Sequence, residues 1–515
     1  MRLEKLCLPF AFGCFILPAA SGLAADGPRE IRTHLVMEPV SLDPALCDDD
    51  VSMRVMANVM DGLMGYDGEG GLKHKLAQSV EISKDRKRYV FKLRPNLFWS
   101  DGKPLTSQHV VLGIKRTLDP HLGAKLASLL FMIRGAKAYY AGTGAADGVA
   151  VRAEGDAKVV IELEKPASYF LHSLTIPQAL PVREDVLAAN GGRWPPRGPS
   201  TGAYHITSYK QGEEIRIEPN ARYWNVKPGT LPVLFRIVPE ESTAVSLFES
   251  GALDVVARVP PLDLDRLRAL GVVQEFPQVA TYFISFNARK PPFNDREFRR
   301  AVAGSIEKEE YVALFKAGNL PATSWLPPGL EGFLPFKRNV DIFSASREAV
   351  TKRLHASPLT ITAAFNSSAM GALFMEKLQN DLKNKLGLEV KLAAMDWKVY
   401  VSAIRNDTPQ LYRFARGASF IDPIWHLASF QSNDPNNPTG WKNAVYDKLV
   451  DEIAALPPGK VRRAKIERAQ AILTNEDAIV IPIFHAVMTH LIAKRVVNFR
   501  MAPNYAVYFD EVRLR

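Results

Sequence analysis

The sequence has 515 residues and a net charge of +10, with 47% hydrophobic and 23% charged residues. A chain of this length exceeds what one hydrophobic core usually supports, so we expect two or three lobes. Its Lys and Arg residues are dispersed, without a long basic run or a pattern of alternating basic and aromatic residues. The composition therefore argues against disordered, collagen-like and coiled-coil proteins, and it gives no indication of a nucleic-acid partner.

The first residues have the organisation of a secretory signal peptide. Arg2 and Lys5 form a basic start, an apolar run follows over residues 6–20, and small residues then provide a cleavage site. About 15 apolar residues are too few to span a bilayer comfortably. We therefore predict that residues 1–24 are removed and that the mature protein is periplasmic.

The use of cysteine agrees with a fold that has no disulfide. Cys7 and Cys14 belong to the predicted signal peptide, so Cys47 is the single cysteine of the mature chain. Three aspartates follow at residues 48–50, and nearby negative charge raises the pKa of a thiol. Cys47 is therefore a poor candidate for a nucleophile.

In the first half of the chain, most of the predicted elements are strands. Alternating apolar residues predict strands, and a Ser or Thr before helical spacing predicts a capped helix. The predictions are strands over 88–94, 158–163 and 215–218, and a helix starting at 105–107 with Val110, Val111, Ile114 and Leu118 on its apolar face.

In the second half, a predicted helix over 373–386 lies between strands over 359–365 and 390–392. This order implies parallel strands with a right-handed crossover. Further helices are predicted over 295–307 and 461–473, the second followed by an apolar run over 478–484. Helices and strands thus alternate along the chain, as in an α/β protein.

Short motifs follow one another along nearly the whole mature chain. The most specific is Phe91-Lys-Leu-Arg94 followed by Trp99-Ser-Asp-Gly-Lys-Pro-Leu-Thr106. Others are Glu38-Pro-Val-Ser-Leu-Asp-Pro44, Thr201-Gly-Ala-Tyr204, Asn220-Ala-Arg-Tyr-Trp224, Pro291-Pro-Phe-Asn-Asp-Arg296 and Asp422-Pro423. Together they resemble the extracellular solute-binding proteins of the oligopeptide and dipeptide ABC transporter class, bacterial solute-binding protein family 5.

The resemblance implies an α/β fold of the periplasmic binding protein-like type, class II, with three lobes and a hinged ligand cleft. Lobe I would comprise residues 25–60, 183–286 and 491–515, lobe II residues 61–182, and lobe III residues 287–490. Two strands crossing between lobes I and III would form the hinge. The protein would act as a monomer without a cofactor, capturing a peptide or peptide-like ligand for an inner-membrane ABC permease with cytoplasmic ATPases.

The resemblance also implies that the ligand is held through its backbone, as when a peptide adds a strand to a sheet. Counted from Asp422-Pro423, the position of the family's amine-binding aspartate is Ser419, and Arg416 adds a positive charge nearby. We therefore predict a ligand without a free α-amine or with an anionic end. The alternative is that Asp422 or an acid from another strand binds the ammonium group. The candidate ligand-binding residues are Val40, Ser41, Tyr282, Asn287, Asn366, Trp397, Arg413, Arg416, Gly417, Ser419 and Asp422.

An enzyme and a metal site are not indicated. The S-x-x-K match at Ser305 to Lys308 lacks the partner motifs of penicillin-interacting enzymes and falls inside a predicted helix. The ten histidines are scattered. Other possibilities are a non-peptide ligand, such as an opine-like conjugate, a metal chelate or haem, and presentation of the ligand to a membrane sensor.

Overall fold

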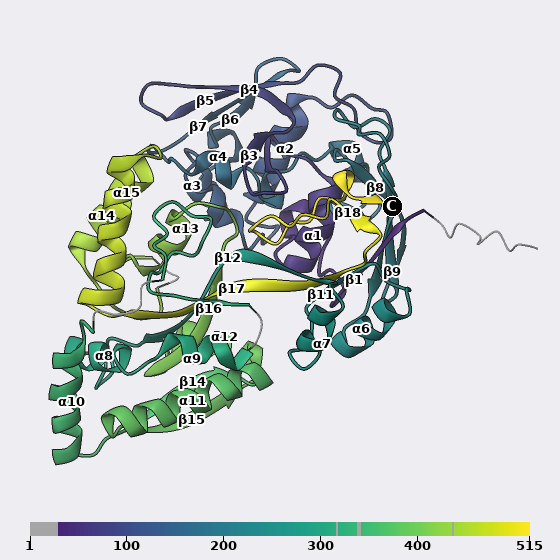
Figure 1. The fold of residues 1–515 in the computed structure, drawn as a ribbon. Coiled ribbons are helices and arrows are strands. Elements are labelled where there is room, and N and C mark those ends of the chain that lie inside the picture. Colours follow the sequence, from purple (N-terminus) through teal and green to yellow (C-terminus); the bar gives the residue numbers. More distant parts are fainter. Residues whose placement is uncertain (1–28, 316–317, 337–340, 435–436) are drawn as a thin grey trace, which may run out of the picture.

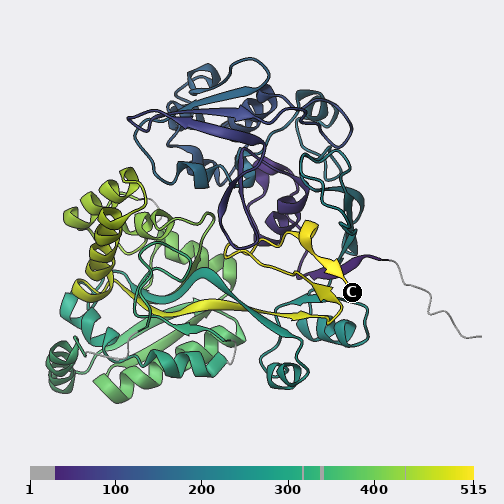
Figure 2. The same cartoon turned by 45° about the horizontal axis from the view of Figure 1, so that its top comes forward.

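The computed structural model describes residues 29–315, 318–336, 341–434 and 437–515, so the predicted signal peptide lies outside the described residues. Three parts surround a central pair of strands (Figures 1 and 2). We call them lobe I, which contains β1 and β8–β11, lobe II, which contains β4–β7, and lobe III, which contains β14–β16. None of the helices within these ranges combines the length and apolar character that a membrane span needs.

One mixed sheet connects lobes I and III. Its strands follow the order β15-β14-β16-β12-β17-β11-β1-β10-β9-β8, and the short β13 (Leu320–Pro321) pairs with β17. The strands are β15 (Glu389–Met395), β14 (Thr360–Asn366), β16 (Leu411–Gly417), β12 (Val273–Phe286), β17 (Val480–Ile492), β11 (Val255–Ala257), β1 (Ile31–Leu35), β10 (Val233–Ile237), β9 (Glu214–Pro219) and β8 (Tyr204–Lys210). The predicted strands over 215–218, 359–365 and 390–392 are thereby confirmed.

The predicted parallel unit in lobe III is also confirmed. Strand β14 pairs in parallel with both β15 and β16, and α11 (Ala369–Leu386) forms the crossover from β14 to β15. The helix ends at Gly387, whose φ of 75° places it in the left-handed region that favours glycine. The carboxyl ends of three parallel strands therefore lie at the same edge of lobe III.

Strands β12 and β17 are the longest in the structure and run side by side through its centre (Figures 1 and 2). Their antiparallel pairing is interrupted by a register shift between Pro277 and Thr281. Within this interruption the Val279 N–H donates instead to the Pro503 carbonyl at 2.9 Å. The two ends of the strand pair are therefore separated by a break in their hydrogen-bond ladder.

Lobe II contains an antiparallel sheet in the order β4-β5-β7-β6. Its strands are β4 (Ala77–Ile82), β5 (Arg88–Leu93), β7 (Lys158–Glu162) and β6 (Val151–Ala153), with the short β2 (Met64–Tyr66) and β3 (Leu72–His74) nearby. The predicted strands over 88–94 and 158–163 are confirmed. The predicted helix is α2 (Ser107–Thr117), which begins after Thr106 in a capping box with His109.

The remaining helices cover the sheets. They are α1 (Asp50–Val59), α3 (Ala136–Tyr140), α4 (Phe170–Ser173), α5 (Glu184–Ala189), α6 (Glu241–Glu249), α7 (Leu264–Ala269), α8 (Arg296–Ala303), α9 (Lys308–Phe315), α10 (Ser344–Ala356), α12 (Trp397–Asn406), α13 (Ile424–Leu427), α14 (Ala444–Ala455) and α15 (Lys460–Ala471). The helix predicted over 461–473 is thus α15, which continues into a π-helical turn. The apolar run over 478–484 leads into β17.

The helix predicted over 295–307 extends four residues beyond the C-terminal end of α8. Helix α8 ends at Ala303, and Ser305 lies in the turn before α9, where its hydroxyl donates to the Ala301 carbonyl at 2.9 Å. The Gly304 carbonyl accepts a hydrogen bond from Arg347 at 2.6 Å. The chain thus turns because α10, which is distant in sequence, binds the carbonyl that would otherwise continue the helix.

Packing links lobes I and II more closely to one another than to lobe III. One hydrophobic cluster extends from lobe II residues such as Phe91 to lobe I residues such as Phe235. Lobe III has two clusters of its own, around Phe374 and around Trp325. Strands β12 and β17 therefore join two separately packed bodies.

Candidate functional site

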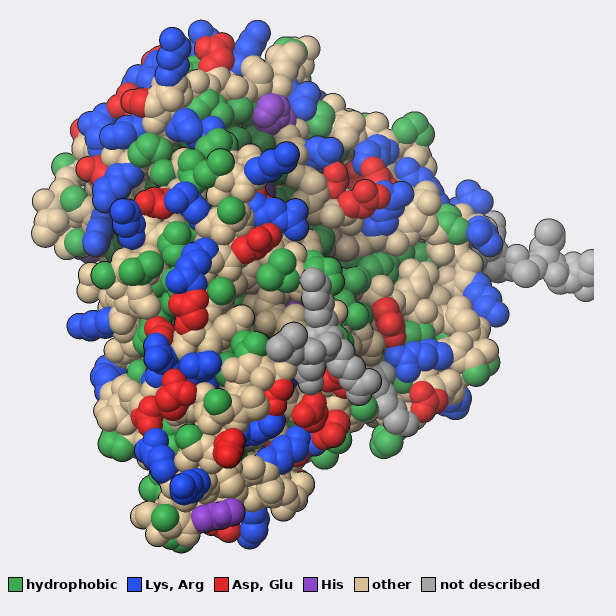
Figure 3. All heavy atoms as spheres, turned by 60° about the vertical axis from the view of Figure 1, so that its left-hand side comes forward, with side chains coloured by type: hydrophobic (Ala, Val, Ile, Leu, Met, Phe, Trp, Pro, Cys, Tyr) green, Lys and Arg blue, Asp and Glu red, His purple; other side chains and the backbone are tan. Residues whose placement is uncertain are grey.

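A pocket of about 360 Å³ lies where the three lobes meet. Its walls come from the segments 48–66 and 175–180, from residues 417–419 and from residues 504–508. The volume is in the range usual for a small-molecule site. On the molecular face shown in Figure 3, acidic and basic side chains are interspersed rather than gathered into a patch of one charge.

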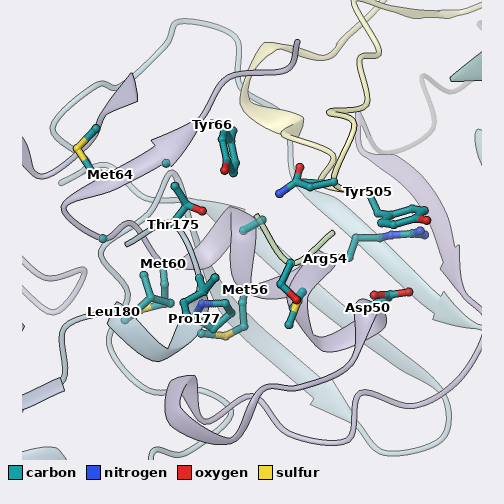
Figure 4. A pocket seen from close by; sticks show the side chains of 18 of the residues that line it. Asp50, Arg54, Met56, Met60, Met64, Tyr66, Thr175, Pro177, Leu180 and Tyr505 are labelled. Atoms are coloured by element: carbon teal, nitrogen blue, oxygen red, sulfur yellow. The ribbon is translucent and has the colours of Figure 1, made fainter. Parts of the chain in front are cut away.

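Helix α1 supplies one wall of the pocket. Asp49 caps the helix by accepting hydrogen bonds from the Val51 and Ser52 N–H groups at 3.0 and 2.9 Å. With 3.6 residues per turn, positions 50, 53, 54 and 57 share one helix face, and all four line the pocket. Figure 4 shows Asp50 and Arg54 at one end of the pocket and Met56 at the other.

The apolar end of the pocket is lined largely by methionine. Met56 and Met60 come from α1 and the residue after it, and Met53 and Met64 line other parts of the pocket. Figure 4 places Pro177 and Leu180 beside Met56 and Met60. Because methionine is unbranched and flexible, such a wall can adapt to apolar groups of different shapes.

Two of the three acids in the pocket are engaged in ion pairs. Asp48 pairs with Lys125 at 2.6 Å. Asp61 lies 3.6 Å from the Lys75 ammonium group and accepts hydrogen bonds from Tyr223 and Trp224 at 2.8 and 3.0 Å. These carboxylates are therefore already neutralised by the protein.

The third acid, Asp50, lies among arginines. The surrounding protein limits hydration and raises the pKa of Asp50, while the positive charges of Arg54 and Arg258 oppose this shift. Burial lowers the pKa of Arg54 to about 10, and repulsion from Arg258 acts in the same direction. Arg54 therefore stays protonated at neutral pH and brings a positive charge to this end of the pocket.

The Arg54 side chain has an unused hydrogen-bonding group. Its Nε is buried without a hydrogen-bond partner. The amide oxygen of Asn504, which also lines the pocket, is likewise buried without a partner. The pocket thus presents a free donor and a free acceptor that a ligand could satisfy.

Of the predicted site residues, Gly417 and Ser419 line the pocket. The Gly417 carbonyl accepts a hydrogen bond from the Trp425 indole at 2.5 Å, which fixes the end of β16. A side chain at position 417 would approach the Tyr505 hydroxyl to 3.5 Å. Ser419 follows on the same segment and brings no charge to the pocket.

Arg413, Tyr282 and Asn366 lie together, but they do not line the pocket. The Arg413 guanidinium lies 5.1 Å from the Tyr282 ring centroid and 5.2 Å from that of Phe374. It also donates to the Asn366 side-chain oxygen at 3.2 Å. This cluster stabilises the strands of lobe III through a buried cation between aromatic rings.

Arg416 is directed away from the pocket. Its guanidinium donates two hydrogen bonds to the Trp425 carbonyl, at 3.0 and 2.7 Å, and lies 4.9 Å from the centroid of the Trp425 ring. Burial lowers its pKa to about 10. We expected Arg416 to bring a positive charge to the site near Ser419, but its guanidinium is hydrogen-bonded inside lobe III and does not line the pocket.

Asp422 and Asn287 form hydrogen bonds within the protein. Asp422 is buried and accepts two hydrogen bonds from Arg462, at 2.8 and 2.9 Å. Asn287 is buried after β12 and donates to the Thr408 carbonyl at 2.8 Å. Neither residue lines the pocket.

The last three predicted residues also lie outside the pocket. The Ser41 hydroxyl accepts a hydrogen bond from the Asp43 N–H at 3.1 Å. Val40 and Trp397 are 67% and 55% exposed, and the Trp397 ring stacks on Phe414. Two exposed apolar side chains of this kind can still meet a ligand that extends beyond the pocket.

Sequence reasoning missed a direct contact between lobes II and III. The Tyr66 hydroxyl accepts a hydrogen bond from the Ile421 N–H at 2.8 Å and lies 3.0 Å from Nδ1 of His172. The rings of Tyr169 and Phe420 stack nearby, at a centroid distance of 5.7 Å. These residues hold the two lobes together beside the pocket.

Chemical groups for catalysis or metal binding do not gather at this site. No group of three or more His, Cys, Asp or Glu side chains within the described ranges could hold a metal ion. Cys47 is buried, and burial together with Asp49 and Asp48 raises the pKa of its thiol well above the ordinary value. Burial is therefore a second reason to expect low reactivity of the Cys47 thiol.

A pocket between three lobes, two of which are joined by a pair of long strands, is suited to binding a small ligand. Sequence comparison identifies the family. The chain belongs to the bacterial extracellular solute-binding proteins, family 5, whose model matches residues 71–438.

Individual relatives match over nearly the whole chain. The dipeptide-binding protein DppE of Bacillus subtilis is 30% identical over 90% of this chain and 88% of its own length. The probable deoxycholate-binding periplasmic protein YgiS of Escherichia coli is 27% identical over 97% and 96%. The solved structure of the Escherichia coli murein tripeptide binding protein MppA superimposes with a TM-score of 0.80 at 25% identity, covering 95% of this chain and 99% of that chain.

Proposed function

We propose that this protein binds a peptide or peptide-like ligand in the pocket between its lobes and delivers it to an inner-membrane ABC permease with cytoplasmic ATPases. The observation that carries the proposal is the pocket itself, because all three lobes contribute to its walls. The names of the dipeptide- and tripeptide-binding relatives support a peptide-like ligand. The basic, apolar start of the chain supports a periplasmic location.

In this proposal lobe III moves relative to lobes I and II to admit and release the ligand. The interruption of the β12–β17 ladder at Pro277 to Thr281 is where such a hinge would bend, since few hydrogen bonds need to break there. The predicted lobe boundaries, at residues 60, 182, 286 and 490, place both long strands at the crossing between lobes I and III. A permease can then distinguish the closed form from the open form.

We also propose that the ligand lacks a free α-amine or has an anionic end, as Ser419 suggested. The alternative, in which Asp422 binds the ammonium group, loses its support because Arg462 occupies that carboxylate. The acids of other segments that line the described pocket do not support this alternative either. Asp48 and Asp61 are paired with lysines, and Asp50 lies next to two arginines.

A non-peptide ligand is the second candidate. The name of the relative YgiS refers to deoxycholate, an amphipathic carboxylate, and the pocket of this chain has both an apolar end and an end that carries Arg54. Presentation of the ligand to a membrane sensor would use the same pocket. Loss of uptake in a strain that lacks the gene would favour the transporter role, whereas unimpaired uptake would favour the sensor.

Native mass spectrometry of the periplasmically expressed protein tests the proposed function. We expect the wild-type protein to carry a bound small molecule, and the variant Ala57→Trp, which fills the pocket from α1, to lack it. Ala145→Trp, at an exposed position of lobe II, is the matched control and should retain the molecule. Equal occupancy of the Ala57→Trp variant and the wild-type protein would contradict the proposal.

A further inference from the structure

The polar groups left unsatisfied in the pocket restrict the class of ligand. A buried polar group without a partner is costly, so unpaired groups in a binding pocket indicate what a ligand must bring. Here the unpaired groups are the Nε of the charged Arg54 guanidinium, a donor, and the Asn504 side-chain oxygen, an acceptor. Asn504 also lines the pocket and is next in sequence to Tyr505, whose ring lies beside Arg54 in Figure 4.

A carboxylate is the natural partner for the donor. Arginine forms short, strong hydrogen bonds with carboxylates, and the second guanidinium nearby, that of Arg258, has the same sign. Asp50 and the neighbouring Asp49 bring negative charge to this end, so the group that needs a ligand acceptor is the unpaired Nε of Arg54.

A free ammonium group has no comparable partner in the pocket. The carboxylate of Asp61 already receives hydrogen bonds from Tyr223 and Trp224 in addition to the charge of Lys75. Ser419 offers a hydroxyl without charge. An amide N–H, by contrast, carries no charge and fits the free oxygen of Asn504.

The other end of the pocket requires an apolar group. Met56 and Met60, together with Pro177 and Leu180, line it, and none of these side chains can donate a hydrogen bond. A short peptide with small or polar side chains would leave this wall unfilled. An acyl chain would cover it, and the flexible methionines could adapt to chains of different length.

We infer that the ligand is an N-acylated amino acid or short N-acylated peptide, with its carboxylate at Arg54, its amide N–H at Asn504 and its acyl chain among the methionines. This inference rests on the proposed function, since it assigns the ligand class of the same pocket. It accounts at once for the unpaired donor, the unpaired acceptor, the apolar wall and the uncharged residue at position 419.

Isothermal titration calorimetry with three synthetic probes tests the inference, using protein refolded from denaturant to remove any bound molecule. The probes are N-octanoyl-alanyl-alanine, the C-terminal amide of the same compound, and trialanine with a free amine. We expect the acylated acid to bind about 10- to 150-fold more tightly than its amide, the usual effect of a hydrogen bond to a charged group. Each CH₂ removed from the acyl chain should weaken binding about fourfold.

The variant Arg54→Met should abolish the preference for the acid over the amide, while Arg266→Met, an exposed arginine of lobe I, should leave that preference intact. Trialanine binding as tightly as the acylated acid would overturn the inference. If the binding of trialanine were lost in Ala57→Trp, the proposed function would stand, but the inferred ligand class would not. Failure of all three probes to bind would overturn the inference too, whereas the occupancy of the purified protein would still decide the proposed function.

Discussion

Removing the Arg462 side chain should destabilise lobe III because Asp422 would be left charged and buried. Arg462 is 1% exposed and connects two parts of the lobe. Its guanidinium donates to both Asp422 oxygens, at 2.8 and 2.9 Å, and to Glu331 at 2.5 Å. Its Nε also donates to the Ile453 carbonyl at 3.1 Å. Among the described residues, Arg462 is the cation that forms an ion pair with the Asp422 carboxylate.

The size of the effect follows from the burial of both partners. Breaking a buried ion pair by removing one side typically costs about 3–5 kcal/mol. For a unit the size of lobe III, 1 kcal/mol corresponds to about 2–4 °C, so Arg462→Met should lower the melting temperature by about 6–20 °C. The double variant Arg462→Met with Asp422→Asn should recover part of this loss, because the second change removes the uncompensated charge.

Differential scanning calorimetry of the wild type, both single variants and the double variant measures this coupling. We expect Asp422→Asn alone to lower the melting temperature without changing the relative affinities of amine-bearing and amine-free ligands. The opposite result, a stable Asp422→Asn variant that binds amine-bearing peptides more weakly, would refute the structural role of Asp422. It would also restore Asp422 as the residue that binds an ammonium group.

Three further predictions concern closure, pH and specificity. Tyr66→Phe leaves the Ile421 N–H unpaired and should weaken ligand binding about 5- to 150-fold by calorimetry; Tyr140→Phe, within lobe II, should not weaken it. Burial lowers the pKa of His485 to about 3, below the ordinary value of 6.5, so the folded state resists protonation and loses stability as the pH falls from 6.5 towards 3. His485→Gln should flatten the dependence of the unfolding free energy on pH by up to about 1.4 kcal/mol per unit, and an unchanged slope would contradict this origin. Ser419→Asp adds an unpaired acid to the pocket and should raise the affinity for trialanine at least about tenfold, whereas no gain would argue against the role of position 419.

The regular elements could be predicted because their patterns are local. Alternation marked β5, β7 and β9, and the strand–helix–strand order fixed the parallel pairing of β14 with β15. The end of α8 could not be predicted in this way. It depends on Arg347, which lies more than 40 residues away in sequence and binds the Gly304 carbonyl.

The candidate site was predictable only in part, for the same physical reason. Ser419 and Gly417 followed from the resemblance along one strand, and the pocket includes both. The sequence analysis did not identify Arg54 as a site residue. The spacing of Asp50, Met53 and Ala57 nevertheless places them on one face of a helix, and Arg54 lies on the same face. Sequence periodicity identifies such a face, but which lobe covers it depends on contacts such as that between Tyr66 and Ile421.

In the proposed function, the ligand class depends on which charges the protein leaves unpaired rather than on which charged residues line the pocket. The pocket holds three carboxylates, and counting them alone would favour a cationic ligand. Lys125 and Lys75 neutralise two of them, and the third, Asp50, lies near Arg54 and Arg258. Similarly, Arg416 stands next to the pocket in sequence but gives its hydrogen bonds to Trp425. The unpaired Nε of Arg54 therefore carries more information about the ligand than any of the paired groups.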